Sequence, residues 1–187
     1  MKLTVKDLSM TAVMAAVICV LSPVAVPLAT HVPISLATLA VMLSGALLGS
    51  RLGTLAAAVY IIVGALGMPV FANYSSGISV LFGMTGGYIF GYLPLAHLSG
   101  WIYERFGRNR DGYHRTAVLM SGMLCGNAVL YTVGTIWFML YTGMPLSGAL
   151  AACVLPFLPG DLLKMCAVCV LVPRLEPALR RIAVPAH

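Results

Sequence analysis

The chain has 187 residues, of which 60% are hydrophobic and only 9% are charged, and its formal net charge is +6. About a quarter of the residues in a soluble domain are charged, so this composition excludes an ordinary soluble protein and indicates an integral membrane protein. The positive charge does not indicate nucleic-acid binding, because no basic face with interleaved aromatic residues accompanies it.

The first predicted helix covers residues 7–22. Lys2 and Lys6 precede its apolar run as they would in a signal peptide, but no small-residue cleavage site follows and two prolines break the run. We therefore interpret it as a retained membrane helix. The connection after it, residues 22–35, contains no lysine or arginine and many apolar residues. We expect this connection to fold back over the protein.

The second and third predicted helices cover residues 35–50 and 52–67, separated by Arg51. Each is shorter than the ~20 residues of an average membrane span, but together they are too long for one straight span. A single helix would also place Arg51 in the middle of the membrane. The sequence therefore predicts two short helices with Arg51 at a tight cytoplasmic turn.

An uncharged segment rich in turn-forming residues, 68–77, leads to the fourth predicted helix. A second apolar stretch, residues 146–155, lies between the last two predicted helices. We expect one integral membrane domain over residues 1–187, an all-α bundle of six transmembrane helices. The remaining three helices are expected at residues 80–104, 116–141 and 159–182.

The basic residues predict the orientation of this bundle, because cytoplasmic segments of membrane proteins are enriched in lysine and arginine. If both termini are cytoplasmic, all but one of the 11 basic residues lie on cytoplasmic segments, and the exception is Lys164. Asp161 is the only acidic residue outside those segments. The predicted cytoplasmic residues are Lys2, Lys6, Arg51, Arg105, Arg108, Arg110, Arg115, Arg174, Arg180 and Arg181.

Asp161 and Lys164 are therefore the candidate functional pair. They are three residues apart at the start of the last helix, so they project from one face of it. Ionisable side chains inside a membrane cost ~2.5–3.5 kcal/mol each at a helix centre and usually mark a functional site. A structural ion pair that fixes the helix end is the alternative.

Uncharged polar residues of the segment before the fourth helix are expected to complete a small-molecule pocket around this pair. Such pockets are mostly apolar with a few placed polar groups. Polar companions are sought among Asn73, Tyr74, Ser75, Ser76, Thr85 and Tyr88, and aromatic walls among Phe71, Tyr88 and Phe157.

Small residues at four-residue spacing predict close helix packing. Gly45, Gly49 and Gly53 form one such series, and internal packing is the expected use. Ala12 and Ala16 give the first helix a flat face, which either packs internally or docks another subunit.

Catalytic chemistry is difficult to assemble from this sequence. Cys166 and Cys169 form a CxxC pair, but no second pair or histidine cluster completes a metal or redox site, and cysteines in apolar runs behave as small hydrophobic residues. The chain has no nucleotide-binding motif. We predict that it is not an enzyme and has no cofactor, so active transport would need a partner or an ion gradient.

Three segments resemble the BioY family, the biotin-specific substrate-binding (S) components of energy-coupling-factor (ECF) transporters. The resemblance extends over about residues 7–182. It departs at Ala37, where many relatives have a longer polar side chain, and at Gly83-Met84-Thr85, where Gly-Pro-Thr is usual. The segments are Pro156-Phe157-Leu158-Pro159-Gly160-Asp161-Leu162-Leu163-Lys164, Gly67-Met68-Pro69-Val70-Phe71-Ala72 and Gly83-Met84-Thr85-Gly86-Gly87-Tyr88. A further match, from Val32-Pro33-Ile34-Ser35-Leu36 through Gly49, resembles the family's loop into the second helix.

The resemblance implies a six-helix bundle in the prokaryotic plasma (inner) membrane, which binds biotin near the outer face beneath the first connection. It implies Asp161 and Lys164 as ligand contacts, with Asn73 and Tyr88 as companions. It also implies that the face of Ala12 and Ala16 contacts the transmembrane coupling (T) subunit, which carries two ATPase subunits.

The sequence thus predicts biotin capture near the outer face and delivery inward with ATPase and T-subunit partners. Asp161 would accept hydrogen bonds from the ureido N–H groups, and Lys164 would meet either the ureido carbonyl or the valerate carboxylate. The alternatives are an S component for another vitamin, a membrane enzyme that uses Cys166 and Cys169 in thiol chemistry, and an assembly subunit.

Overall fold

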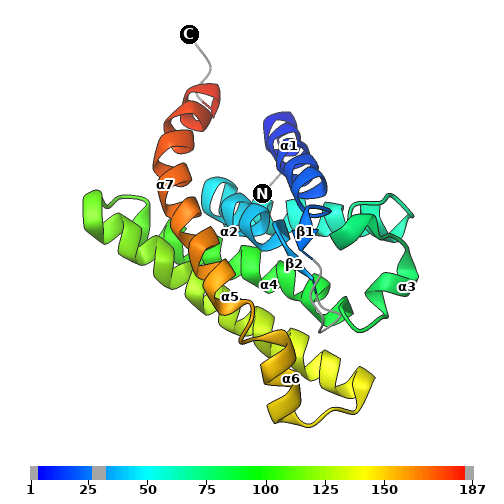
Figure 1. Ribbon diagram of the computed structural model, residues 1–187. Coiled ribbons are helices and arrows are strands. Elements are labelled where there is room, and N and C mark those ends of the chain that lie inside the picture. Colours follow the sequence, from blue (N-terminus) through cyan, green and yellow to red (C-terminus); the bar gives the residue numbers. More distant parts are fainter. Residues whose placement is uncertain (1–3, 27–32, 184–187) are drawn as a thin grey trace.

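In the computed structural model, which describes residues 4–26 and 33–183, the chain is almost entirely helical (Figure 1). The predicted ligand-covering connection, residues 22–35, falls partly outside these residues, because 27–32 are not described. In chain order the elements are α1 (Val5–Leu21), β1 (Ala25–Val26), β2 (Ile34–Ser35), α2 (Ala37–Ala65), η1 (Ala72–Tyr74), α3 (Ile78–Leu81), α4 (Gly86–Ile102), η2 (Tyr103–Gly107), α5 (Gly112–Thr142), α6 (Leu146–Cys153) and α7 (Leu158–Ala183).

Where the sequence predicts two helices, over residues 35–50 and 52–67, the structure has α2 with a sharp break at Gly49. This residue has φ 86° and ψ 178°, a conformation that is essentially restricted to glycine. The chain turns back so far that a Cβ at Gly53 would lie 2.6 Å from the Cα of Gly45, whereas eight residues of straight helix span about 12 Å. Glu104 accepts hydrogen bonds from the backbone N–H and the hydroxyl of Ser50 at this break. The turn therefore lies one to two residues before Arg51.

The structure corrects the continuous helix expected over residues 80–104. That range is divided into the single turn α3, the helix α4 and the wide turn η2. The chain turns so tightly between α3 and α4 that a Cβ at Gly86 would lie 1.8 Å from the carbonyl oxygen of Leu81. The indole of Trp137 donates a hydrogen bond to the carbonyl of Gly83, with a nitrogen–oxygen distance of 2.9 Å. A side chain of α5 thus satisfies a backbone group that a continuous helix would have satisfied.

Helix α4 lies between α2 and α5 and forms the centre of the molecule. Small residues allow the backbones to approach on both sides of it. A Cβ at Gly45 would lie 2.4 Å from the carbonyl oxygen of Ala96, and a Cβ at Gly91 would lie 2.6 Å from the side chain of Leu130. Close backbone packing of this kind stabilises helix pairs where the hydrophobic effect does not drive their association.

The only described strands are β1 and β2, which the sequence did not predict. They form a short antiparallel pair in which Ala25 lies opposite Ser35 and Val26 opposite Ile34. The hydroxyl groups of Ser22 and Tyr60 are 2.6 Å apart, so the residue that caps α1 is joined to α2. In Figure 1 the β1–β2 pair lies near the centre, α3 at the right and α6 at the bottom, and the C-terminal end of α7 lies at the top.

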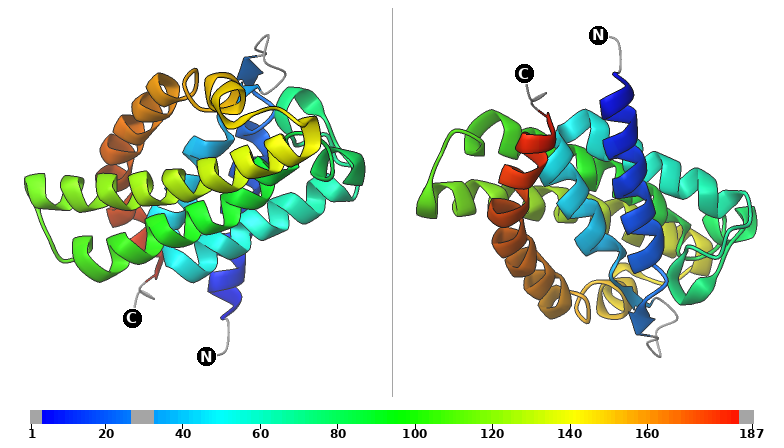
Figure 2. Two further views of the ribbon diagram at one scale, coloured as in Figure 1. Left: turned by 90° about the horizontal axis from the view of Figure 1, so that it is seen from below. Right: turned by 90° about the horizontal axis from the view of Figure 1, so that it is seen from above.

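Among the described residues, α2 and α5 are each long and apolar enough to cross a membrane by length and composition alone, although α2 turns back at Gly49. Helices α6 and α7, bent by 47° at the break between them, could together form a third span. Helices α1 and α4 have 17 residues each, somewhat fewer than the ~20 of an average span. Figure 2 shows the N-terminal end of α1 and the C-terminal end of α7 on the same side of the molecule.

Candidate functional site

Asp161 and Lys164 lie in the first two turns of α7 and are both buried, with exposed fractions of 2% and 7%. The ammonium nitrogen of Lys164 is 2.8 Å from Oδ1 of Asp161. Burial of two charges away from water is unfavourable unless further hydrogen bonds satisfy them. The neighbouring helices supply those bonds.

Thr38, in the first turn of α2, joins both members of the pair. Its hydroxyl donates to Oδ1 of Asp161 over 3.1 Å and accepts from Lys164 over 3.0 Å. Lys164 also donates to the backbone carbonyl of Ser35, at 2.7 Å. All three N–H groups of the ammonium therefore have a protein acceptor.

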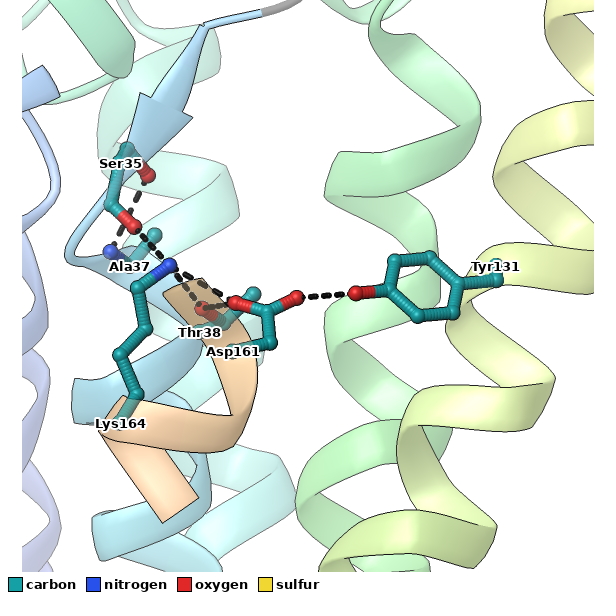
Figure 3. Close-up of polar contacts among 6 residues, drawn as sticks. All are labelled: Ser35, Ala37, Thr38, Tyr131, Asp161 and Lys164. Atoms are coloured by element: carbon teal, nitrogen blue, oxygen red, sulfur yellow. Dashed lines mark hydrogen bonds and ion pairs between the residues drawn. The ribbon is translucent and has the colours of Figure 1, made fainter. Parts of the chain in front are cut away.

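Tyr131 on α5 holds the other oxygen of the carboxylate. Its phenol donates a short hydrogen bond to Oδ2 of Asp161 (Figure 3). Asp161 thus accepts three hydrogen bonds from α2, α5 and α7, whereas an ionised carboxylate has about four acceptor sites. One further donor can therefore bind without displacing a protein group.

The pair faces a cavity of about 270 Å³ that is lined by residues of α2, α4, α5 and α7 and of the segments before α2 and α4. The structure brings all six predicted ligand-site residues together at this cavity. They are Phe71, Asn73, Tyr88, Phe157, Asp161 and Lys164.

Aromatic rings form much of the cavity wall. Phe71 and Tyr60 meet edge to face with their centroids 5.5 Å apart, and Tyr60 lies 6.2 Å from Tyr92. The phenol of Tyr88 is 3.4 Å from the hydroxyl of Thr135. An apolar, aromatic wall with a charged hydrogen-bonding pair suits a small amphiphilic ligand.

Asn73 offers an uncommitted polar group to the cavity. It has φ 56° and ψ 34°, and with Tyr74 it forms two consecutive non-glycine residues in the left-handed region. Its backbone N–H donates to the carbonyl of Pro23, but its side-chain amide makes no hydrogen bond with any described residue. Backbone strain of this kind is often found at ligand-binding segments.

Of the other predicted companions, Ser75 and Thr85 line the cavity, whereas Tyr74 and Ser76 do not. Cys166 and Cys169 lie deeper along α7 as free cysteines and do not line it either. Ala12 and Ala16 lie elsewhere, on the exposed face of α1.

Sequence reasoning missed Thr38, Tyr131, Ser35, Tyr60 and Tyr92 as cavity residues. Tyr131 and Thr38 carried a weak signal, because each is a polar residue inside an apolar helix. Ser35 acts through its backbone carbonyl, which no side-chain pattern reveals.

Comparisons with known proteins agree on one family. Residues 1–181 match the model of the BioY family. The chain is 34% identical to the biotin transporter BioY2 of Lactococcus lactis subsp. cremoris (strain MG1363), over 84% of this chain and 83% of that protein. It is 37% identical to the biotin transporter BioY of Rhodobacter capsulatus, over 75% of this chain and 77% of that protein.

A solved structure supports the same assignment. The crystal structure of the S-component for biotin from an ECF-type ABC transporter matches with a TM-score of 0.82 and 28% sequence identity, over 92% of each chain. The chain as a whole thus has a fold that has been observed experimentally.

Proposed function

The chain belongs to the BioY family, and we propose that it is the biotin-binding S component of an ECF-type vitamin transporter. The relatives are transport proteins rather than enzymes. The observation that carries the proposal is the buried Asp161–Lys164 pair, which lies at a cavity walled by aromatic rings.

Asp161 is proposed to accept a hydrogen bond from a ureido N–H group of biotin. Three protein donors already fix its orientation, so the carboxylate is organised before the ligand arrives and little entropy is lost on binding. The side-chain oxygen of Asn73 is a candidate acceptor for the second ureido N–H. Phe71, Tyr88 and Phe157 would contact the apolar bicyclic ring.

Lys164 is proposed to keep the charge of Asp161 compensated and to contact an oxygen of the ligand. Its three donors are engaged by Asp161, Thr38 and the carbonyl of Ser35. A ligand oxygen must therefore replace one of these acceptors. The carbonyl of Ser35 is the acceptor whose loss disturbs the Asp161 carboxylate least, because it makes no bond to that carboxylate.

The proposed topology has six transmembrane helices with both termini in the cytoplasm. It is supported by the basic residues, since Arg51 follows the break in α2 and Arg105, Arg108 and Arg110 occupy the turn between α4 and α5. The protein would then lie in the prokaryotic plasma (inner) membrane with the Asp161 cavity near the outer face.

Uptake is proposed to depend on a coupling subunit and two ATPase subunits. Ala12 and Ala16 are both exposed on α1 and are four residues apart, so they leave a shallow face that another helix can approach closely. This face is the proposed contact with the coupling subunit.

The mass of the ligand that copurifies with the protein tests this function. We expect native mass spectrometry of gently purified protein to release biotin, and to release much less from the Asp161→Asn variant. A different vitamin in the wild-type sample would contradict the assignment of biotin while keeping the cavity as a ligand site. Absence of any small molecule, even after incubation with biotin, would contradict both.

A further inference from the structure

The arginines around the turn between α4 and α5 fall into two groups. Arg115 donates to Glu176 of α7 and to the phenol of Tyr103, and Arg108 lies 3.6 Å from Glu176. Arg51 and Arg105, in contrast, are exposed and form no ion pair with any described residue. Arg110, farther along the turn, is also exposed and unpaired among the described residues, so Arg51 and Arg105 are the two uncompensated cations that lie next to the break in α2.

Hydrogen bonds join the residues that directly precede these two arginines in the sequence. Ser50 directly precedes Arg51, and Glu104 directly precedes Arg105. Oε2 of Glu104 accepts from the N–H and the hydroxyl of Ser50 at 2.9 Å and 2.8 Å. Gly100 packs against the same turn, since a Cβ there would lie 2.6 Å from the Ser50 nitrogen. The break in α2 and the end of α4 thus form one surface with an arginine on each side of the contact.

Glu104 contributes a carboxylate to this surface, but both of its oxygens already have partners. Its Oε2 holds Ser50, and its Oε1 lies 3.9 Å from Nη1 of Arg108. The positive charges of Arg51 and Arg105 are therefore not compensated by Glu104. A ligand that compensates them must bring an anion.

Aromatic residues continue this surface toward the middle of α4. Trp101 and Phe106 are 49% and 55% exposed and meet edge to face with their centroids 6.3 Å apart. His97, one turn from Trp101 on the same face, is also exposed and makes no hydrogen bond with any described residue. Tryptophan is enriched where a span meets the lipid headgroups, and an exposed histidine inside a span needs a polar partner.

We propose that the surface formed by Arg51, His97, Trp101, Arg105 and Phe106 binds the headgroup of an anionic phospholipid in the cytoplasmic leaflet. The lipid phosphate would lie between the two arginines, which are well shaped for bidentate phosphate recognition. The rings of Trp101 and Phe106 would contact the glycerol and upper acyl region. His97 would donate to an ester or phosphate oxygen.

This inference concerns lipid recognition, so it goes beyond the proposed transport function and shares only the proposed topology with it. The charge excess fits an anionic headgroup, and the chain of exposed residues runs along α4 from the turn into the apolar span. A membrane phospholipid has the same orientation, with its phosphate at the membrane surface and its acyl chains deeper. This alignment favours a lipid over a soluble protein segment.

The test compares lipid retention by the full chain in nanodiscs that contain phosphatidylcholine with or without phosphatidylglycerol. After transfer to detergent, native mass spectrometry counts the phospholipids that remain bound. We expect the wild-type protein to retain phosphatidylglycerol and to lose phosphatidylcholine. The double variant Arg51→Gln/Arg105→Gln should bind phosphatidylglycerol roughly 30-fold more weakly, because each arginine near an anionic surface contributes about a factor of five.

A control variant, Arg110→Gln/Arg174→Gln, removes the same charge from exposed positions outside this surface and should retain the lipid as the wild type does. Equal retention by wild type and the Arg51/Arg105 variant overturns the proposal, and so does equal loss in the control. Retained lipid together with lost capture of the coupling subunit would assign the surface to a protein partner instead. Biotin binding measured on the same samples reports separately on the transport function.

Discussion

The phenol of Tyr131 on α5 donates a hydrogen bond to Oδ2 of Asp161 on α7, 30 residues away in the sequence. Oδ1 of the same carboxylate is held by Lys164 and by Thr38. Figure 3 shows Tyr131 on one side of the carboxylate and Thr38 with Lys164 on the other. Asp161 is therefore fixed by groups of three helices before any ligand arrives.

Replacement of Tyr131 by phenylalanine should weaken biotin binding without abolishing it. The variant leaves Oδ2 of a buried carboxylate without its protein donor, which costs about 1–3 kcal/mol, or roughly 5–150-fold in affinity. Isothermal titration of purified protein measures the change. Tyr141→Phe on the exposed part of the same helix is the matched control and should bind biotin normally. Identical affinities in both variants would remove Tyr131 from the site.

Replacement of Lys164 by methionine should destabilise the protein, because it leaves Asp161 as an uncompensated buried charge. Removal of one partner from a buried pair costs about 3–5 kcal/mol. The double variant Asp161→Asn/Lys164→Met should recover most of the lost stability but still fail to bind biotin. Thermal unfolding in detergent and biotin titration measure the two effects. If the double variant binds biotin as tightly as the wild type, the pair is only a structural clamp.

Replacement of Gly49 by alanine should lower stability by about 1–3 kcal/mol, because its conformation is costly for any other residue. The added Cβ would also lie 1.9 Å from Oε1 of Glu104. Thermal unfolding measures the loss. Gly148→Ala on α6, where the nearest atoms would be 3.9 Å away, should leave the unfolding temperature unchanged. An equally small effect at both glycines would show that the break in α2 does not depend on Gly49.

Replacement of Ala12 and Ala16 together by leucine should prevent capture of the coupling subunit while biotin binding stays normal. The larger side chains separate backbones that must approach closely. Copurification of the coupling and ATPase subunits with the variant, after coexpression, is the measurement. Ile136→Leu, which keeps a similar volume at an exposed position of α5, should copurify both. If the Ala12→Leu/Ala16→Leu variant captures the coupling subunit normally, the interface lies elsewhere.

The residues that line the cavity were predictable from the sequence to different extents. Asp161 and Lys164 were identifiable because charges stand out in apolar helices, and resemblance to the family supported Asn73 and Tyr88. Tyr131 and Thr38 were not identified, since an uncharged polar residue in a membrane helix often bonds only to its own backbone. Their role depends on how α2, α5 and α7 meet, and one sequence does not specify that geometry.

Features of the fold that depend on composition and charge were predictable from the sequence. Features that depend on local backbone geometry were less predictable. The turn before Arg51 followed from length and charge. The division of the fourth helix did not, because the break near Gly83 is completed by Trp137 from a helix 54 residues away in the sequence. The β1–β2 pair was also missed, as strands of two residues leave no periodic pattern.

Titration of biotin into the purified full-length protein, as wild type and as Asp161→Asn, tests the central claim most directly. The amide has nearly the shape of the carboxylate but lacks its charge and presents a donor in place of one acceptor. Hydrogen bonds to charged groups contribute about 1.5–3 kcal/mol, so we predict tight binding by the wild type and an affinity lower by about 10–150-fold in the variant. No binding by the wild type, or equal affinity in the folded variant, would contradict the account.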